Sequence, residues 1–160
     1  MKSILIVAAL LCVACSAFAE GVVPQFGIEA NAVSFNQTSS LPSDFESGGV
    51  VSLSLSPHIS AHGAVLFGLS RSYLRAPVGL RVTATDVRNQ NFSVGFGLEY
   101  QASSKPSVRP QEIAATATAG IKLWPEQLPQ VILGMQGGVG IKTGTPMLLI
   151  GATYALPINL

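Results

Sequence analysis

The clearest feature of this chain is a regular alternation of large apolar residues with small or polar ones. The segment NFSVGFGLEYQA, residues 91–102, has its apolar positions at Phe92, Val94, Phe96, Leu98 and Tyr100. The residues between them are serine, glycine, glutamate and glutamine. Period-two alternation predicts a β-strand whose two faces meet different environments. The apolar face could meet either a protein core or lipid.

Seven further segments carry the same pattern, and polar stretches rich in Gly, Pro, Ser or Asn separate them. The predicted strands are Gln25–Phe35, Val50–Ser56, Ile59–Ser72, Leu74–Thr85, Asn91–Ala102, Glu112–Trp124, Val131–Lys142 and Met147–Ile158. Helix signals are scarce, and neighbouring strands joined in this way are expected to pair antiparallel. The two longest predicted loops are Asn36–Gly49 and Ser103–Gln111.

The N-terminal segment differs from the rest of the chain. Residues 1–19, MKSILIVAALLCVACSAFA, contain Lys2, an apolar run and small residues before Glu20. This is the pattern of a secretory signal peptide, so we expect export through the Sec pathway and one β-barrel domain over residues 20–160. A membrane anchor and lipoprotein processing at Cys15 are the alternatives.

Composition narrows the class of protein further. Both cysteines lie in the signal, so a mature chain has no disulfide, no thiol catalysis and no Cys-built zinc site. Without Lys2, eight Lys and Arg balance eight Asp and Glu, which gives no support to nucleic-acid binding. Charged residues make up 11% of the chain, less than half the usual share of a soluble domain. Outside the signal, no apolar run approaches the roughly 18 residues of a spanning helix.

The polar faces of the strands are better suited to a crowded barrel lumen than to a water-exposed surface. They consist mostly of Gly, Ser, Ala and Thr, whereas the solvent face of a soluble sheet usually carries Lys, Glu, Arg and Thr. The strands are also long, and a tilted membrane strand needs about 9–11 residues. A sheet spans lipid only as a closed barrel. We therefore predict an all-β fold, an eight-stranded antiparallel up-and-down transmembrane β-barrel.

Charged and aromatic residues sort by face and by strand end. The charged strand residues on the face opposite the apolar one are Glu29, Arg81, Glu99, Lys122 and Lys142. On the lipid face each would cost about 2–4 kcal/mol at the midplane, so we expect a lumen network in which Glu99 pairs with Lys142. The aromatic residues predict two interfacial girdles, with Phe26, Phe92 and Trp124 at the periplasmic end and Tyr73 and Tyr100 at the outer end.

With its signal peptide, cysteine-free mature chain and eight alternating strands, the chain resembles the small outer-membrane barrels of Gram-negative bacteria. These include the OmpA membrane domain and the OmpX and OmpW-like proteins. The last strand, LIGATYALPINL, is similar to their assembly signal through Gly151, Tyr154 and Leu156, although Leu160 replaces the usual terminal Phe and Pro157 interrupts the strand. The resemblance implies a monomer in the outer membrane whose partners are the bilayer, lipopolysaccharide and the assembly machinery.

Few residues suggest chemistry. Some barrels of this kind are lipid A deacylases that use a His-x-Ser pair, and this chain contains His58-Ile59-Ser60, but in a predicted periplasmic turn. His62 would point into the lumen, where a hydrogen-bonded structural role is the default. The glycines of residues 95–97 and 134–140 are spaced by two along strands, so they do not form a phosphate loop. We expect no catalytic residue, no metal and no cofactor.

The sequence leaves four functions open. We expect a non-enzymatic outer-membrane barrel whose extracellular loops mediate surface contact or envelope integrity. Because small residues dominate the interior, a narrow channel or apolar-solute conduit is the main alternative. A lipid A-modifying barrel enzyme and a soluble periplasmic ligand-binding β-barrel are the others.

Overall fold

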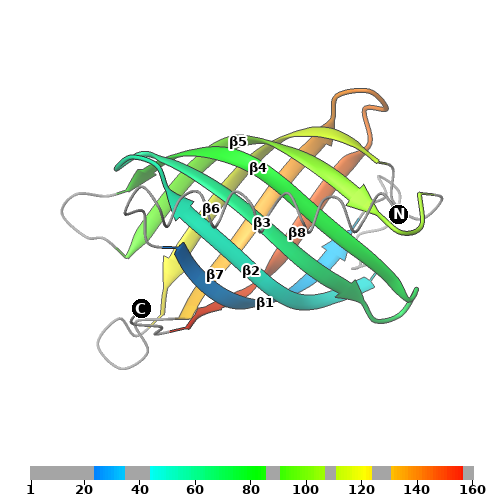
Figure 1. Cartoon of the computed structure of the whole chain (residues 1–160), viewed down its shortest axis with the longest axis horizontal. Coiled ribbons are helices and arrows are strands. Elements are labelled where there is room, and N and C mark those ends of the chain that lie inside the picture. The colour runs from blue at the N-terminus through cyan, green and yellow to red at the C-terminus, as the bar shows by residue number, and fades with distance from the viewer. Residues whose placement is uncertain (1–23, 35–43, 86–90, 107–110, 124–130, 157–160) are drawn as a thin grey trace.

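The fold is a closed β-barrel, seen in a computed structural model that describes residues 24–34, 44–85, 91–106, 111–123 and 131–156. The strands are β1 (Pro24–Ser34), β2 (Asp44–Ser54), β3 (Ile59–Gly68), β4 (Tyr73–Thr85), β5 (Phe92–Ser103), β6 (Glu112–Lys122), β7 (Val131–Gly140) and β8 (Pro146–Ala155). Each strand pairs antiparallel with the next, and β1 also pairs with β8, which closes the sheet (Figure 1). This confirms the predicted eight-stranded up-and-down barrel.

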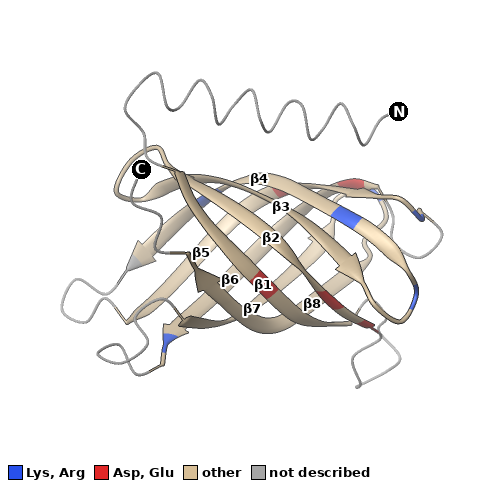
Figure 2. Cartoon of the chain, turned by 60° about the horizontal axis from the view of Figure 1, so that its bottom comes forward, with Lys and Arg blue, Asp and Glu red and all other residues tan. Residues whose placement is uncertain are grey.

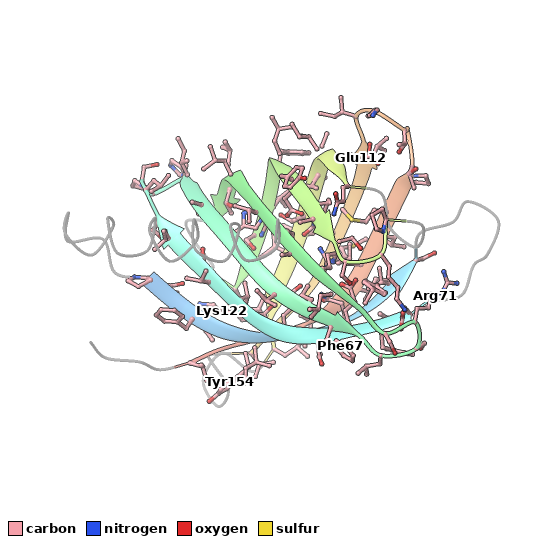
Figure 3. All side chains as sticks on the ribbon, turned by 45° about the vertical axis from the view of Figure 1, so that its right-hand side comes forward. Phe67, Arg71, Glu112, Lys122 and Tyr154 are labelled. Carbon is pink, nitrogen blue, oxygen red and sulfur yellow. The ribbon has the colours of Figure 1, made fainter. Side chains whose placement is uncertain are left out.

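The alternation in the sequence becomes an inside and an outside in the barrel. In β5, Phe96 is 66% exposed on the outer surface, whereas Glu99 is 2% exposed in the interior. Figure 3 shows Phe67 of β3 and Tyr154 of β8 pointing away from the barrel wall. Charged positions are few along the strands (Figure 2). Among the described residues, no helix is long and apolar enough to cross a membrane.

Several strand ends differ from the prediction. Strand β2 begins at Asp44, whereas the sequence predicts a loop up to Gly49. The Gly48-Gly49 pair looks like a turn, yet Gly48 pairs with Glu29 of β1 and with Leu66 of β3. A side chain at Gly48 would collide with the backbone of Val65, so the sheet itself requires glycine there.

Two strands also end earlier than predicted because tight turns follow them. Strand β3 ends at Gly68, and Ser72 in the turn after it has a positive φ of 51°. Strand β7 ends at Gly140, and Gly144 in the next turn has a φ of 67°, which glycine adopts at no steric cost. These turns lie at the end of the barrel that we call the outer end. The inner end is the one at which β1 begins and β8 ends.

Candidate functional site in the barrel lumen

The outer half of the lumen contains a buried ion pair between β2 and β4. The Arg75 guanidinium donates to the Glu46 carboxylate, with Nη2 2.6 Å and Nε 2.8 Å from Oε2. The Tyr73 hydroxyl donates to Glu46 Oε1 over 2.6 Å. Arg75 Nη1 also donates to Gln101 Oε1 on β5, over 3.2 Å. Since all four side chains are buried, this cluster fills the barrel across three strands.

A second cluster surrounds Glu99 of β5 in the middle of the lumen. Its carboxylate accepts four hydrogen bonds, from His62 Nε2 at 2.7 Å, Arg81 Nη2 at 3.3 Å, Gln101 Nε2 at 2.6 Å and Gln136 Nε2 at 2.9 Å. Because His62 Nε2 faces a carboxylate, that nitrogen carries the proton. Gln101 joins this cluster to the Glu46–Arg75 pair, and we call the eight side chains the lumen network: Glu46, His62, Tyr73, Arg75, Arg81, Glu99, Gln101 and Gln136.

The lumen network, with apolar neighbours, closes the outer half of the barrel. Within the described strands, buried inward side chains come from nearly every side of the wall. They include Val33 of β1, Leu66 of β3, Thr116 of β6 and Leu149 of β8. Each acid in the network is hydrogen-bonded and faces at least one arginine, which offsets the cost of taking its charge out of water.

The structure brings together only part of the predicted charge network. Arg81 and Glu99 meet in the lumen. Glu29 also faces the lumen and accepts from Asn31 Nδ2 at 2.5 Å. Lys122 is the last residue of β6 and is half-buried.

The predicted pairing of Glu99 with Lys142 needs correction. Lys142 is exposed in the turn after β7, because that strand ends at Gly140. Glu99 instead forms an ion pair with Arg81 and accepts a hydrogen bond from His62.

Several network residues were missed in the sequence. Glu46 lies in the predicted loop Asn36–Gly49, and Arg75 is not among the predicted lumen charges, although it has the same parity as Arg81 on β4. The predicted strand Leu74–Thr85 contains Arg75, and counting back by twos from Arg81 places its side chain inside. Gln136 carries no charge, so the search for charged lumen residues does not indicate it. His62, in contrast, occupies the expected hydrogen-bonded position in the lumen.

The aromatic residues form a different pattern from the two predicted girdles. Tyr73 is only 1% exposed and points into the lumen towards Glu46, so its predicted place in the outer girdle is corrected. Phe92 at the inner end and Tyr100 towards the outer end are exposed on the outer surface. Phe26 is half-buried. Trp124 lies outside the described residues, as does the predicted signal peptide.

The predicted assembly-signal residues lie on β8 and just after it. Tyr154 and Leu156 are exposed on the outer surface. Gly151 has the opposite parity and faces the lumen, where a side chain would collide with Ala30 and Asn31 of β1. The last strand therefore presents its aromatic and aliphatic residues to the surroundings, and its glycine to the seam where the barrel closes.

Two acids at the outer end clamp neighbouring turns. Asp44, the first residue of β2, accepts from the backbone amides of Ser70 and Arg71 in the β3–β4 turn. Glu112, the first residue of β6, accepts from the amides of Lys142 and Thr143 and from the Thr143 hydroxyl in the β7–β8 turn. In both cases the carboxylate satisfies turn donors that strand pairing leaves without partners.

We expect Glu112→Ala to destabilise the barrel by about 1–3 kcal/mol, because it leaves several donors of the β7–β8 turn unsatisfied. Lys142→Ala is the matched control, since Lys142 hydrogen-bonds Glu112 only through its backbone amide, which the substitution keeps. Urea unfolding in lipid vesicles measures both variants. Equal stability of the two variants would contradict the clamp.

A cavity occupies the lumen on the inner side of the network. It has a volume of about 300 Å³, and Arg81, Glu99 and His62 lie along its deeper part. Gln25, Ser93 and Ala155, at the inner ends of their strands, also line it. The cavity thus reaches from the lumen network to the inner end of the barrel.

The His58-Ile59-Ser60 motif does not form a lipid-facing pair. His58 is exposed in the turn between β2 and β3, with Nδ1 3.3 Å from the carbonyl oxygen of Thr83. Ser60 faces the lumen and lines the cavity. The two side chains therefore belong to different surfaces.

The barrel is similar to that of TMB2.3, a de novo designed protein solved by solution NMR. The two chains share 17% identity over 86% of this chain and 97% of the designed one, with a TM-score of 0.54. The KdgM porin, in complex with disordered oligogalacturonate, matches at 12% identity over 84% of this chain and 99% of its own, with a TM-score of 0.35. The first likeness concerns the fold alone, and the second is too weak to support an argument.

No protein family model matches the chain, and no curated protein sequence matches it. The finer resemblance to the OmpA membrane domain, OmpX and OmpW-like proteins therefore stays a prediction.

Proposed function

We propose that this chain is a monomeric, non-enzymatic protein of the Gram-negative outer membrane that crosses the bilayer as a closed barrel. The observation that carries the proposal is the apolar outer surface. Large apolar side chains are exposed on every strand, among them Ile28, Phe45, Phe67, Leu80, Phe96, Ile113, Met135 and Ile150. A soluble monomer rarely exposes such a contiguous apolar surface, whereas lipid solvates it.

The filled outer half of the lumen favours a non-conducting barrel over the channel alternative. Glu46, Tyr73 and Arg75 are each at most 2% exposed, so other atoms cover these three side chains almost completely. The cavity borders this region at Leu66, Arg75 and Leu149 and extends from it towards the inner end. Opening a path would require breaking the Glu46–Arg75 pair, which is costly in a buried setting.

The outer end supports a role in surface contact and envelope integrity. Arg71, Lys105 and Lys142 are all exposed there, and Lys105 Nζ donates to the carbonyl oxygen of Arg71 over 3.0 Å. Figure 3 shows Arg71 at this end of the barrel. The nearby acids Asp44 and Glu112 are buried and engaged by turn amides. The described part of this rim therefore presents cations, which suit the phosphate groups of lipopolysaccharide.

The proposal also includes the inner end and the last strand. With export through the Sec pathway, the inner end faces the periplasm. The exposed Tyr154 and Leu156 of the last strand are the residues that we propose the assembly machinery recognises. The absence of a shared surface for His58 and Ser60 gives no support to lipid A chemistry.

Fractionation and a conductance measurement test this proposal together. We expect the folded protein in the outer-membrane fraction, soluble only in detergent and migrating differently on a gel before and after heating. In a planar bilayer the purified protein should give no stepwise currents. Folded protein in the soluble periplasm would overturn the membrane location, and regular current steps would favour the channel.

A further inference from the structure

One carboxylate in the lumen, that of Glu29, has no cation beside it among the described residues. Away from the rim, the inward acids of the described strands are Glu29, Glu46 and Glu99. Arg75 is bound to Glu46, and Arg81 is bound to Glu99 together with His62. Within the described residues, Glu29 makes no ion pair, and its hydrogen bond from Asn31 does not neutralise its charge.

The surroundings of Glu29 leave space beside its carboxylate. Its direct neighbours across the sheet are Gly48 on β2 and Thr153 on β8. Gly27 precedes it on the same face of β1, and Glu29, Gly27 and Thr153 all line the cavity. No large side chain therefore stands between this carboxylate and a cavity of about 300 Å³.

Lys122 is the nearest candidate for an internal counter-charge, and the structure does not place it there. It shares a lateral row with Glu29 through Ile132 of β7 and Thr153 of β8. It is not among the cavity-lining residues, and no Lys, Arg or His nitrogen of the described residues lies within ion-pair distance of Glu29. Glu29 is half-buried and has only the neutral Asn31 amide as a partner, so a cation from outside the chain would stabilise its charge.

We propose that the cavity binds a small organic monocation, with its ammonium group at Glu29 and its body along the inner lumen. A primary ammonium has three donors, which suit the carboxylate and the hydroxyl-rich wall formed by Ser52, Ser60 and Thr153. The aliphatic side chains of Val50 and Ile132 provide apolar contact for a short chain. The ligand enters at the inner end, because the lumen network closes the other.

The cavity's other charged groups define the ligand class further. Arg75 and Arg81 line the part of the cavity next to the lumen network, so a second positive charge on the ligand would meet two guanidinium groups there. A calcium-like metal ion takes six to eight oxygen ligands, and the described residues contain no group of three acids or histidines that could hold a metal. Of the two carboxylates that line the cavity, Glu99 is paired with Arg81, and the single unpaired carboxylate of Glu29 is better suited to an organic amine.

The test uses the refolded barrel in detergent micelles, so its result does not depend on the membrane location or on conductance. The probe is n-butylammonium, and n-butanol is its neutral counterpart of nearly the same shape. Titration is followed through amide chemical shifts of the cavity wall. We expect n-butylammonium to bind at least about tenfold more tightly than n-butanol, since only the ammonium interacts with a full charge.

Two variants locate the site. Glu29→Gln keeps the size of the side chain and should weaken n-butylammonium binding by about tenfold or more. Ser93→Ala removes a polar group from another part of the same cavity wall and should leave binding within about twofold. Equal binding of amine and alcohol by the wild-type protein, or no binding of the amine, overturns the proposal even if a variant fails to fold. Unchanged amine binding by Glu29→Gln overturns it as well.

Discussion

Leu98→Arg should prevent the barrel from inserting into the membrane. Leu98 lies in the middle of β5, is 56% exposed on the outer surface and has Leu80 and Ala115 as its outward neighbours. An arginine at the membrane midplane of a barrel costs about 2–4 kcal/mol. Assembly intermediates carry the same unfavourable charge, so we expect loss of the heat-modifiable folded band and of protein from the outer-membrane fraction.

Two controls separate lipid exposure from other effects of this substitution. Leu98→Ala removes packing but adds no charge, and it should still insert. Ser93→Arg puts the same arginine on the opposite face of the same strand, where it enters the cavity, and it should insert too. Gly97 is unsuitable as the inward control, because any side chain there would collide with the carbonyl oxygen of Leu80. If Leu98→Arg and Ser93→Arg inserted equally well, the assignment of faces would be wrong.

The parts of this fold that depend on local pattern were predictable from the sequence. Phe96, Leu98 and Glu99 alternate in size and polarity, and strand geometry turns that alternation directly into opposite faces. The inward position of Arg81 follows from the same rule. Burial of one face also sets the register, since a shift by one residue would turn every side chain to the wrong side.

The parts that depend on contacts across the barrel were not predictable in this way. Glu99 and His62 are 37 residues apart, and their contact requires the registers of β3, β4 and β5 to be known together. Tyr73 looks like an interfacial aromatic residue because it begins a strand. In the structure its side chain lies in the lumen, where its hydroxyl donates to Glu46. Lys142 has the inward parity of β7, but the strand turns before reaching it.

Arg75→Met is expected to destabilise the folded barrel more than any other change in the lumen network. The substitution removes the hydrogen bonds to Glu46 and to Gln101, and it leaves the Glu46 carboxylate buried with only the Tyr73 hydroxyl as a partner. Breaking one side of a buried pair costs about 3–5 kcal/mol. The exposed Arg71 provides the matched control, and Arg71→Met should change stability by less than about 0.5 kcal/mol. Urea unfolding in lipid vesicles, followed through the folded gel band, measures both.

A double variant shows whether Arg75→Met loses stability because the Glu46 charge is left uncompensated or because packing is lost. Glu46→Gln combined with Arg75→Met removes the carboxylate charge while keeping an acceptor for the Tyr73 hydroxyl. If the uncompensated charge dominates, the double variant should be more stable than Arg75→Met alone, with a coupling of about 1–3 kcal/mol between the two positions. Strictly additive losses would mean that the arginine stabilises the barrel by filling space, and that its charge contributes little to keeping the outer half of the lumen closed.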